Sequence, residues 1–363
     1  MAAEQKRLED RLAKRGGLVE LLRLPALVFG ALAKLRGRLY DSGRLTAFRL
    51  GIPVVCIGNL SVGGTGKTPM VIWITRELVR RGWRPGLLSR GYGKAGEELN
   101  DEARELRRVL PEVPHVQNPD RVAGGQALEK EGVDIIVMDD GFQHRRLGRD
   151  LDLVLIDATR PWGLPAPSAG VAPVCACLPR GFLREAPIAL SRASAILMTR
   201  TDQVDRKVLE GLRQEFEELA PGIPIAETIH KPAGLRVVVG DELALEQLSG
   251  REVDLFSGIG NPEAFEQTVS ELGAKVIEHR RFPDHHSYTA SDLVGLGEQR
   301  PVLTTAKDIV KCNELYSSLD SLYVLEVELT LVAGDAVVGA MLDSISKGSA
   351  AHERDSLHAG LHG

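Results

Sequence analysis

The chain has 363 residues, of which 43% are hydrophobic and 4% aromatic, and its formal net charge is −5 at pH 7. This length predicts two domains with a large buried core. Four cysteines without a paired pattern fit a reducing cytoplasm rather than a disulfide framework, and the few aromatic residues argue against nucleic-acid binding.

The N-terminal segment, residues 1–45, is basic and amphipathic. Residues 1–50 contain 11 Lys and Arg against 5 Asp and Glu, and residues 16–40 are rich in leucine. A polar stripe faces a broad apolar one in this stretch, which is typical of a helix lying in a membrane interface. Four residues form the stripe: Glu20, Arg23, Lys34 and Arg38.

Three other interpretations of this segment remain. A helix packed on its own domain has the same periodicity. A spanning helix needs about 20 mostly apolar residues, and charged residues and Pro25 interrupt this one. A cleaved signal peptide needs a clear small-residue cleavage site, and it would export a cytoplasmic type of nucleotide site.

The most informative stretch follows the apolar run 54–57 and reads S-V-G-G-T-G-K-T. Its glycines let backbone N–H groups turn toward an anion, while Lys67 reaches the outer phosphates and Thr68 holds Mg²⁺. A serine stands where the P-loop pattern has its first glycine, so an ordinary glycine-rich turn is the alternative. The predicted ATP-binding residues are Ser61, Val62, Gly63, Gly64, Thr65, Gly66, Lys67 and Thr68.

Strand and helix patterns alternate after the P-loop. An amphipathic helix is predicted over residues 70–81, with Pro69 suited to its first turn. We expect a short strand running into a glycine-rich turn over 85–93, further strands at 133–140, 151–157 and 195–199, and helices at 101–110 and 204–219. This alternation predicts an α/β fold, a P-loop NTPase-like doubly wound, mainly parallel sheet over residues 46–227, with ligands at the carboxyl ends of its strands.

A second α/β pattern follows residue 227. Strands are expected near 254–260, 275–277 and 301–305, and Asn261-Pro262 opens a helix. We therefore predict a smaller α/β domain over residues 228–345 and a disordered tail over 346–363.

Two carboxylates, Asp139 and Asp140, end a hydrophobic strand. P-loop enzymes place there the carboxylate that steadies Mg²⁺, and Gln143 and His144 follow beside the same site. A solvated strand end is the alternative for the carboxylates, and a surface position for His144. The sequence leaves open which aspartate contacts the metal.

Two further clusters carry weaker signals. Asp101 and Glu102 open a predicted helix, and helix capping explains an Asp there. Asp284-His285-His286 follows a proline in the second domain, where a carboxylate beside a histidine suggests proton transfer. The C-x-C of Cys175 and Cys177 has no second cysteine pair, so small loop residues explain it better than metal ligands.

The motifs occur in a specific order along the chain. They are G-N-L-S-V-G-G-T-G-K-T-P (58–69), S-R-G-Y-G (89–93), D-E (101–102), D-D-G-F-Q-H (139–144), L-P-R-G-F-L-R-E (178–185), S-G-I-G-N-P (257–262), F-P-D-H-H (282–286) and T-T-A-K-D (304–308). The set resembles the tetraacyldisaccharide 4′-kinase family over residues 16 to about 311.

This resemblance implies transfer of the ATP γ-phosphate to the 4′-hydroxyl of an acylated glucosamine disaccharide 1-phosphate. The reaction belongs to lipid A biosynthesis, on the cytoplasmic face of the bacterial inner membrane. The implied partners are the lipid substrate and an anionic membrane surface, with no obligate protein partner. An N-terminal membrane-associated helix is part of the implied fold.

The resemblance also implies a set of site residues. The catalytic group is Asp101, His285 and Lys67. The Mg²⁺ group is Thr68, Asp139, Asp140, Gln143 and Glu102. The substrate group is Arg90, Tyr92, Arg184 and Glu185.

The chain departs from the family pattern in two places. Asn100 stands where the family has a glycine before its D-E, and residues 164–177 contain an insertion of about ten residues.

A membrane-associated switch ATPase of the partitioning or arsenical-pump type is the alternative function. Such proteins carry a lysine ahead of the paired glycines, where this chain has Ser61 and Val62. A third possibility is a nucleotide-binding scaffold without turnover. Such a protein would not need the carboxylate of Asp101 and the imidazole of His285, which lie apart from the phosphate loop in the sequence.

Overall fold

The computed structural model describes residues 2–91, 101–168, 170–284, 286–312 and 315–346. The chain divides into two compact units. The smaller unit comprises residues 1–10 and 230–330, and the larger unit comprises residues 11–229 and 331–363.

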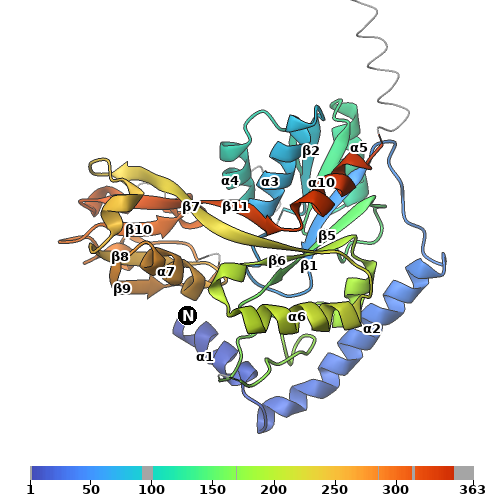
Figure 1. Cartoon of the computed structure of the whole chain (residues 1–363), viewed down its shortest axis with the longest axis horizontal. Coiled ribbons are helices and arrows are strands. Elements are labelled where there is room, and N and C mark those ends of the chain that lie inside the picture. Colours follow the sequence, from blue (N-terminus) through green and yellow to red (C-terminus); the bar gives the residue numbers. More distant parts are fainter. Residues whose placement is uncertain (1, 92–100, 169, 285, 313–314, 347–363) are drawn as a thin grey trace, which may run out of the picture. The chain divides into compact units, whose positions relative to one another are not determined.

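Eleven strands of the described residues form one mixed, mostly parallel sheet in the order β3-β2-β4-β1-β5-β6-β7-β11-β10-β8-β9 (Figure 1). In the larger unit the strands are β1 (Val54–Asn59), β2 (Pro85–Ser89), β3 (His115–Gln117), β4 (Ile135–Asp139), β5 (Leu151–Asp157) and β6 (Ala195–Thr199). In the smaller unit they are β8 (Glu252–Ser257), β9 (Lys275–Arg281) and β10 (Val302–Thr305). Strands β7 (Ile225–Val239) and β11 (Leu322–Ala333) contribute residues to both units.

The central strand β1 is fully buried and pairs in parallel with β4 on one side and β5 on the other. Because these three strands run the same way, their carboxyl ends meet at one edge of the sheet, where ligands collect in doubly wound folds. The predicted α/β fold with a mainly parallel sheet is confirmed.

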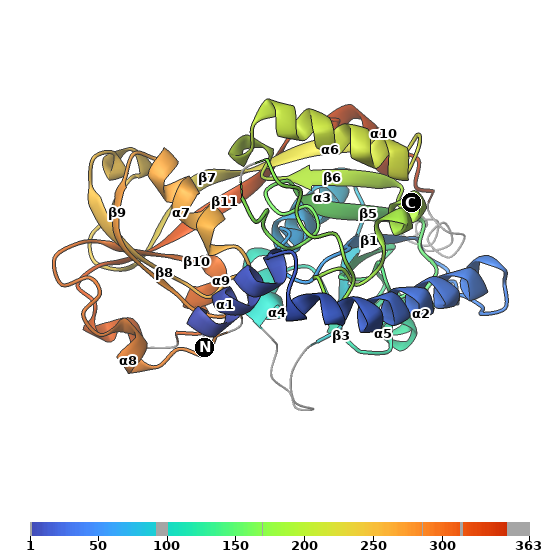
Figure 2. The ribbon, with the colours of Figure 1, turned by 90° about the horizontal axis from the view of Figure 1, so that it is seen from below.

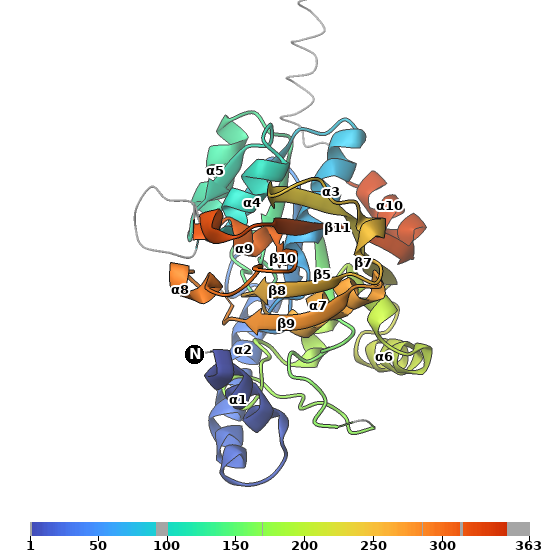
Figure 3. The same ribbon diagram turned by 90° about the vertical axis from the view of Figure 1, so that its left-hand side faces the viewer.

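Helices cover both faces of the larger unit's sheet. Helix α6 (Arg206–Leu219) packs Leu212 and Phe216 against β5 and β6, and α5 (Arg121–Lys130) packs Val122 and Leu128 against β1 and β4. Helix α3 (Lys67–Arg80) lies on the face opposite α6 (Figures 1 and 3). The remaining helices of this unit are α2 (Arg23–Asp41), α4 (Asp101–Val109) and α10 (Asp335–Asp343), with short 3-10 turns η1 (Leu18–Leu22), η2 (Pro187–Arg192) and η3 (Thr201–Gln203).

The smaller unit has its own core around β8, β10 and β11. Its helices are α7 (Pro262–Glu271), α8 (Ala290–Leu293) and α9 (Ala306–Ile309), with η4 (Leu245–Leu248) and η5 (Leu315–Ser318). Helix α1 (Ala2–Ala13) begins in this unit and ends in the larger one. The Asn261 side chain caps α7 at Ala264 N, 3.2 Å away, as Asn does at helix N-termini.

The boundary predicted at residue 345 differs from the division seen here, because α10 belongs to the larger unit. The carboxylate of Asp343 pairs with Arg81 of that unit at 3.1 Å. Gly334, which precedes α10, lies against Ala226, since a Cβ there would stand 2.9 Å from the Ala226 Cα. The predicted tail, residues 346–363, lies outside the described residues apart from Ser346.

Residues 18–41 form η1 and the long helix α2 (Figure 2), and several leucines of this segment are exposed. Pro25 is the third residue of α2, where its missing N–H costs no hydrogen bond. The exposed large apolar residues are Leu18, Leu21, Leu24, Leu27, Val28, Phe29, Leu32 and Leu35. Within the described residues, none of the helices has the length and apolar character required to cross a bilayer.

A buried arginine fastens the segment before α2 to the rest of the larger unit. Arg180 is fully buried, and it donates to the carbonyls of Leu12 (2.5 Å) and Lys14 (2.9 Å) and to the Glu20 carboxylate (2.7 Å). The hydrogen bond from Arg180 is the largest cause that lowers the pKa of Glu20 to about 2. Glu20 therefore stays charged at neutral pH and compensates the buried guanidinium.

Phe216→Ala is expected to destabilise the larger unit by about 3–5 kcal/mol, because Phe216 is fully buried and packs edge-on against Trp162. Denaturant unfolding followed by tryptophan fluorescence measures the loss, since all three tryptophans lie in this unit. The control is Val208→Ala, at an exposed position of the same helix. Equal midpoints for the two variants would contradict this assignment of the core.

Candidate active site

The P-loop occupies the turn between the buried strand β1 and the start of α3. Gly63 and Gly66 have φ values of 119° and 86°, which L-amino acids with a Cβ rarely adopt. Gly66 is the N-cap of α3, and Lys67 and Thr68 form its first turn. The loop and the free N–H groups of this helix end suit an anion such as a phosphate.

Side chains from neighbouring strand ends hold the P-loop in place. The Asn59 amide, at the end of β1, donates to Ser61 O (2.9 Å) and to Thr65 Oγ1 (3.0 Å). From β6, Thr199 donates to Thr65 O (3.1 Å), and the next residue, Arg200, donates to Gly64 O (3.1 Å). The loop is therefore ordered by the protein itself, which lowers the cost of ordering it around a ligand.

Asp140 follows β4 and lies between two cations. Arg184 Nη1 is 2.8 Å and 2.9 Å from its two carboxylate oxygens, and Lys67 Nζ is 3.7 Å from Oδ1. Burial acts to raise the pKa of Asp140, but Lys67 and Arg184 outweigh it and hold the pKa below its ordinary value. Its φ of 52° is unusual for a non-glycine residue and turns the chain sharply after the strand.

Asp139, the last residue of β4, is 5% exposed, and its Oδ1 has no hydrogen-bond partner within the described residues. Burial, followed by the charge of Glu102 in α4, raises its pKa to about 7. A buried carboxylate oxygen without a partner, close enough to Glu102 and Asp140 for their charges to raise its pKa, fits a hard divalent cation such as Mg²⁺. When bound, this ion would neutralise charge on the transferring phosphate.

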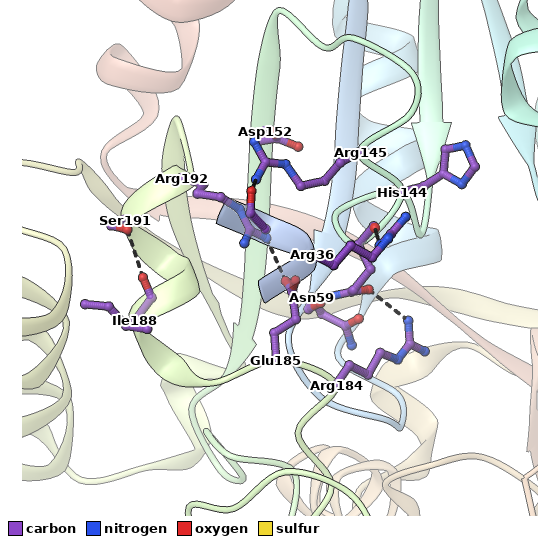
Figure 4. Close-up of polar contacts among 12 residues, drawn as sticks. Arg36, Asn59, His144, Arg145, Asp152, Arg184, Glu185, Ile188, Ser191 and Arg192 are labelled. Carbon is purple, nitrogen blue, oxygen red and sulfur yellow. Dashed lines mark hydrogen bonds and ion pairs between the residues drawn. The ribbon is translucent and has the colours of Figure 1, made fainter. Parts of the chain in front are cut away.

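The segment carrying Arg184 and Glu185 runs beside the start of the P-loop (Figure 4). Val62 N donates to Phe182 O (2.8 Å), and Arg184 N donates to Leu60 O (2.8 Å). The Glu185 carboxylate accepts from Arg192 at 2.6 Å rather than pointing freely into solvent. These backbone contacts bring Arg184 to Asp140 across 44 residues of sequence.

Gln143 lies within the same cluster but does not present a free amide. Its Nε2 donates to Asn59 O (2.8 Å), and its Oε1 lies 3.4 Å from Arg184 Nη1. The neighbouring His144 is half-buried, and burial, followed by the charge of Arg121, lowers its pKa to about 4. His144 is therefore neutral at physiological pH.

Some predicted site residues lie elsewhere or outside the description. Tyr92 and His285 are outside the described residues, and Asp101 is described only as the first residue of α4. Arg90 follows β2 and is exposed. In the smaller unit, Asp284, the residue before His285 in the sequence, pairs with Lys307 at 2.9 Å.

Three residues at the site were not predicted from the sequence. Asn59 and Arg200 hold the P-loop, and Arg121 at the start of α5 is 3% exposed and lowers the pKa values of Asp140 and His144. Of these three residues, only Asn59 lies close in sequence to a recognisable motif, two residues before the P-loop begins at Ser61. Within the described residues, no group of three or more His, Cys, Asp or Glu side chains is arranged to hold a metal ion.

A glycine-rich phosphate loop after a central parallel strand, with paired carboxylates at the end of the adjacent strand, defines a P-loop phosphotransferase or NTPase. The family model described as Tetraacyldisaccharide-1-P 4′-kinase matches residues 18–346. The chain therefore belongs to this family and is a kinase, as its motifs predict.

Individual relatives agree with the family match. A tetraacyldisaccharide 4′-kinase of Anaeromyxobacter dehalogenans is 39% identical over 86% of this chain and 87% of its own length. One of Syntrophus aciditrophicus is 35% identical over 80% and 83%. The crystal structure of the "apo" form of LpxK from Aquifex aeolicus in complex with ATP is 29% identical, with a TM-score of 0.69, and covers 91% of this chain and 99% of that one.

Lys67→Ala is expected to abolish turnover, because its ammonium group would act on the β and γ phosphates and balances Asp140. Its unfolding temperature should stay close to that of the unaltered protein, since Lys67 belongs to no core cluster. Lys207→Ala, at an exposed position of α6, is the matched control. Near-normal activity of Lys67→Ala would show that the P-loop assignment is wrong.

Proposed function

We propose that the protein transfers the γ-phosphate of ATP to the 4′-hydroxyl of an acylated glucosamine disaccharide 1-phosphate. The observation that carries the proposal is the Asp140 carboxylate held between Lys67 and Arg184, next to a P-loop, in a chain of this family. Fixed positive charge beside a P-loop supports this proposal, because such charge stabilises a phosphoryl group during its transfer.

The chain's own residues divide the work as follows. The P-loop backbone and Lys67 bind the phosphates, and the Thr68 hydroxyl with the Asp139–Asp140 pair would hold Mg²⁺. Arg184 keeps Asp140 in position and charged. Asp101 takes the proton from the attacking sugar hydroxyl, and His285 orients or tunes that carboxylate.

We also propose that the protein works at the cytoplasmic face of the inner membrane, attached through α2. The exposed leucines of α2 and the arginines and lysines among residues 1–50 supply the two signals that interfacial attachment needs. An acylated acceptor stays in the bilayer, so attachment brings the enzyme to its substrate.

A direct assay tests the reaction. Purified protein in mixed micelles receives ATP labelled at the γ-phosphate, Mg²⁺ and the acylated disaccharide 1-phosphate, and label is followed in the lipid and aqueous phases. We expect label in the lipid, and none there with Lys67→Ala. A switch ATPase would instead release all of the label as inorganic phosphate, which would overturn the proposal.

Replacing Leu24, Leu27 and Leu32 by Gln is expected to reduce sedimentation with anionic vesicles by more than tenfold. Each leucine contributes about 1.5–3 kcal/mol when its side chain leaves water. These substitutions are preferable to deleting residues 1–40, because deletion would leave the buried Arg180 without Glu20. The control is Val79→Gln with Val208→Gln, at exposed positions away from α2. Unchanged sedimentation of the triple variant would mean that α2 does not bind the membrane.

Asp101→Ala and His285→Ala are each expected to lower kcat by roughly 10²- to 10⁴-fold with little change in the affinity for ATP. Because the two side chains act as a unit, the double variant should be scarcely worse than the poorer single variant. His286→Ala is the control, because His286 is the neighbouring histidine and its ring already stacks on Phe282 and pairs with Asp292. Strictly multiplicative losses would contradict the catalytic pair.

A further inference from the structure

The amphipathic helix α2 contacts the turn that follows the two site aspartates. Arg36 Nη1 donates to the backbone carbonyl of Gln143 at 2.9 Å. In return, Arg145 donates to Gly37 O (2.8 Å) and to the Asp41 carboxylate (2.7 Å). Both guanidinium groups lie over the Tyr40 ring, 5.5 Å and 5.3 Å from its centroid. The C-terminal part of α2, residues 36–41, thus contacts residues 143–145.

The same turn contacts the nucleotide site through its other side. The Gln143 amide donates to Asn59 O, the carbonyl at the end of β1, and its oxygen faces Arg184, which holds Asp140. Figure 4 shows Arg36, Asn59 and Arg184 gathered around this turn. One residue, Gln143, therefore connects α2 with the strand that leads into the P-loop and with the cation on Asp140.

We propose that Arg36 is a positioning residue for phosphoryl transfer, which fixes the Gln143 turn and through it the Asp140 side of the magnesium and phosphate site. This inference rests on the proposed function and adds to α2 a second role besides membrane attachment.

The geometry separates this role from a simple contribution to stability. Arg36 is exposed, so its removal opens no cavity in the core. Its guanidinium donates to the backbone carbonyl of Gln143, and the Gln143 side chain donates to Asn59 O within the site. Small displacements at a reacting centre are costly in rate, by as much as roughly 100-fold for about 1 Å.

Arg38 provides a matched control on the same helix. It is exposed, and its side chain has no hydrogen bond or ion pair to any part of the chain that the structure describes. Arg36→Ala and Arg38→Ala each remove one positive charge from α2, so an effect of net charge alone would appear in both variants. They differ in the contact with Gln143.

The first measurement is the Mg²⁺ dependence of binding of a fluorescent ATP analogue, in detergent and without lipid acceptor. We expect Arg36→Ala to need severalfold more Mg²⁺ for half-saturation, Arg36→Lys to recover part of the loss, and Arg38→Ala to match the unaltered protein. Equal Mg²⁺ dependence for Arg36→Ala and Arg38→Ala would overturn the inference.

The second measurement is kcat in mixed micelles at saturating lipid, with vesicle sedimentation of each variant alongside. Arg36→Ala should lose roughly tenfold in kcat while sedimenting as Arg38→Ala does. Since Arg36 acts through Gln143, the Arg36→Ala, Gln143→Ala double variant should be no slower than Gln143→Ala alone. Multiplicative losses would contradict this. Absence of lipid phosphorylation by the unaltered protein would reject the proposed function instead, and the binding measurement would still decide on Arg36.

Discussion

The Asp140 carboxylate, paired with Arg184 and facing Lys67, is the interaction on which the site depends. It joins three parts of the chain that are distant in sequence: the end of β4, the first turn of α3 and the segment beside the P-loop. The side chains of all three groups are only 15–25% exposed, so solvent screens their charges weakly, and Asp140 keeps Arg184 as its partner when Lys67 is removed. The same two cations keep Asp140 ionised, while the neighbouring Asp139 has its pKa raised to about 7. The pKa values of these adjacent carboxyl groups are therefore shifted in opposite directions because their surroundings differ.

Much of the larger unit could be predicted because its signals are local. Strand β1, the P-loop and α3 follow one another directly in the sequence. The strand predicted at 133–140 is found as β4, which ends at Asp139. Helix α5 escaped prediction because Gly124 and Gly125 hide its periodicity. Both glycines are required by packing, since a Cβ at Gly124 would stand 2.6 Å from Leu88 Cδ1 and one at Gly125 2.6 Å from Leu50 Cδ1. Strand β3 has only three half-buried residues, too few to show alternation.

The site residues also fall into those with a local sequence signal and those without one. The P-loop and the paired aspartates are recognisable because each is a contiguous motif, and Arg184 and Glu185 were found only through the family resemblance. Arg200 and Arg121 had no such signal, because an arginine's role here depends on which strand ends the sheet brings together. The roles of Asp101, Tyr92 and His285 stay predictions. Helix α2 showed its apolar face in the sequence, but its polar contacts with the turn at Gln143 depend on tertiary packing.

The central claim is that the protein phosphorylates one hydroxyl group of a lipid acceptor. The position of the new phosphate on that lipid is therefore the most direct test. Fragmentation of the purified product by tandem mass spectrometry distinguishes the two sugar rings and locates the added group. The account predicts one new phosphate, carrying the γ label of ATP, on the 4′-oxygen of the disaccharide. A phosphate on any other oxygen, or an unaltered lipid alongside hydrolysed ATP, would contradict it.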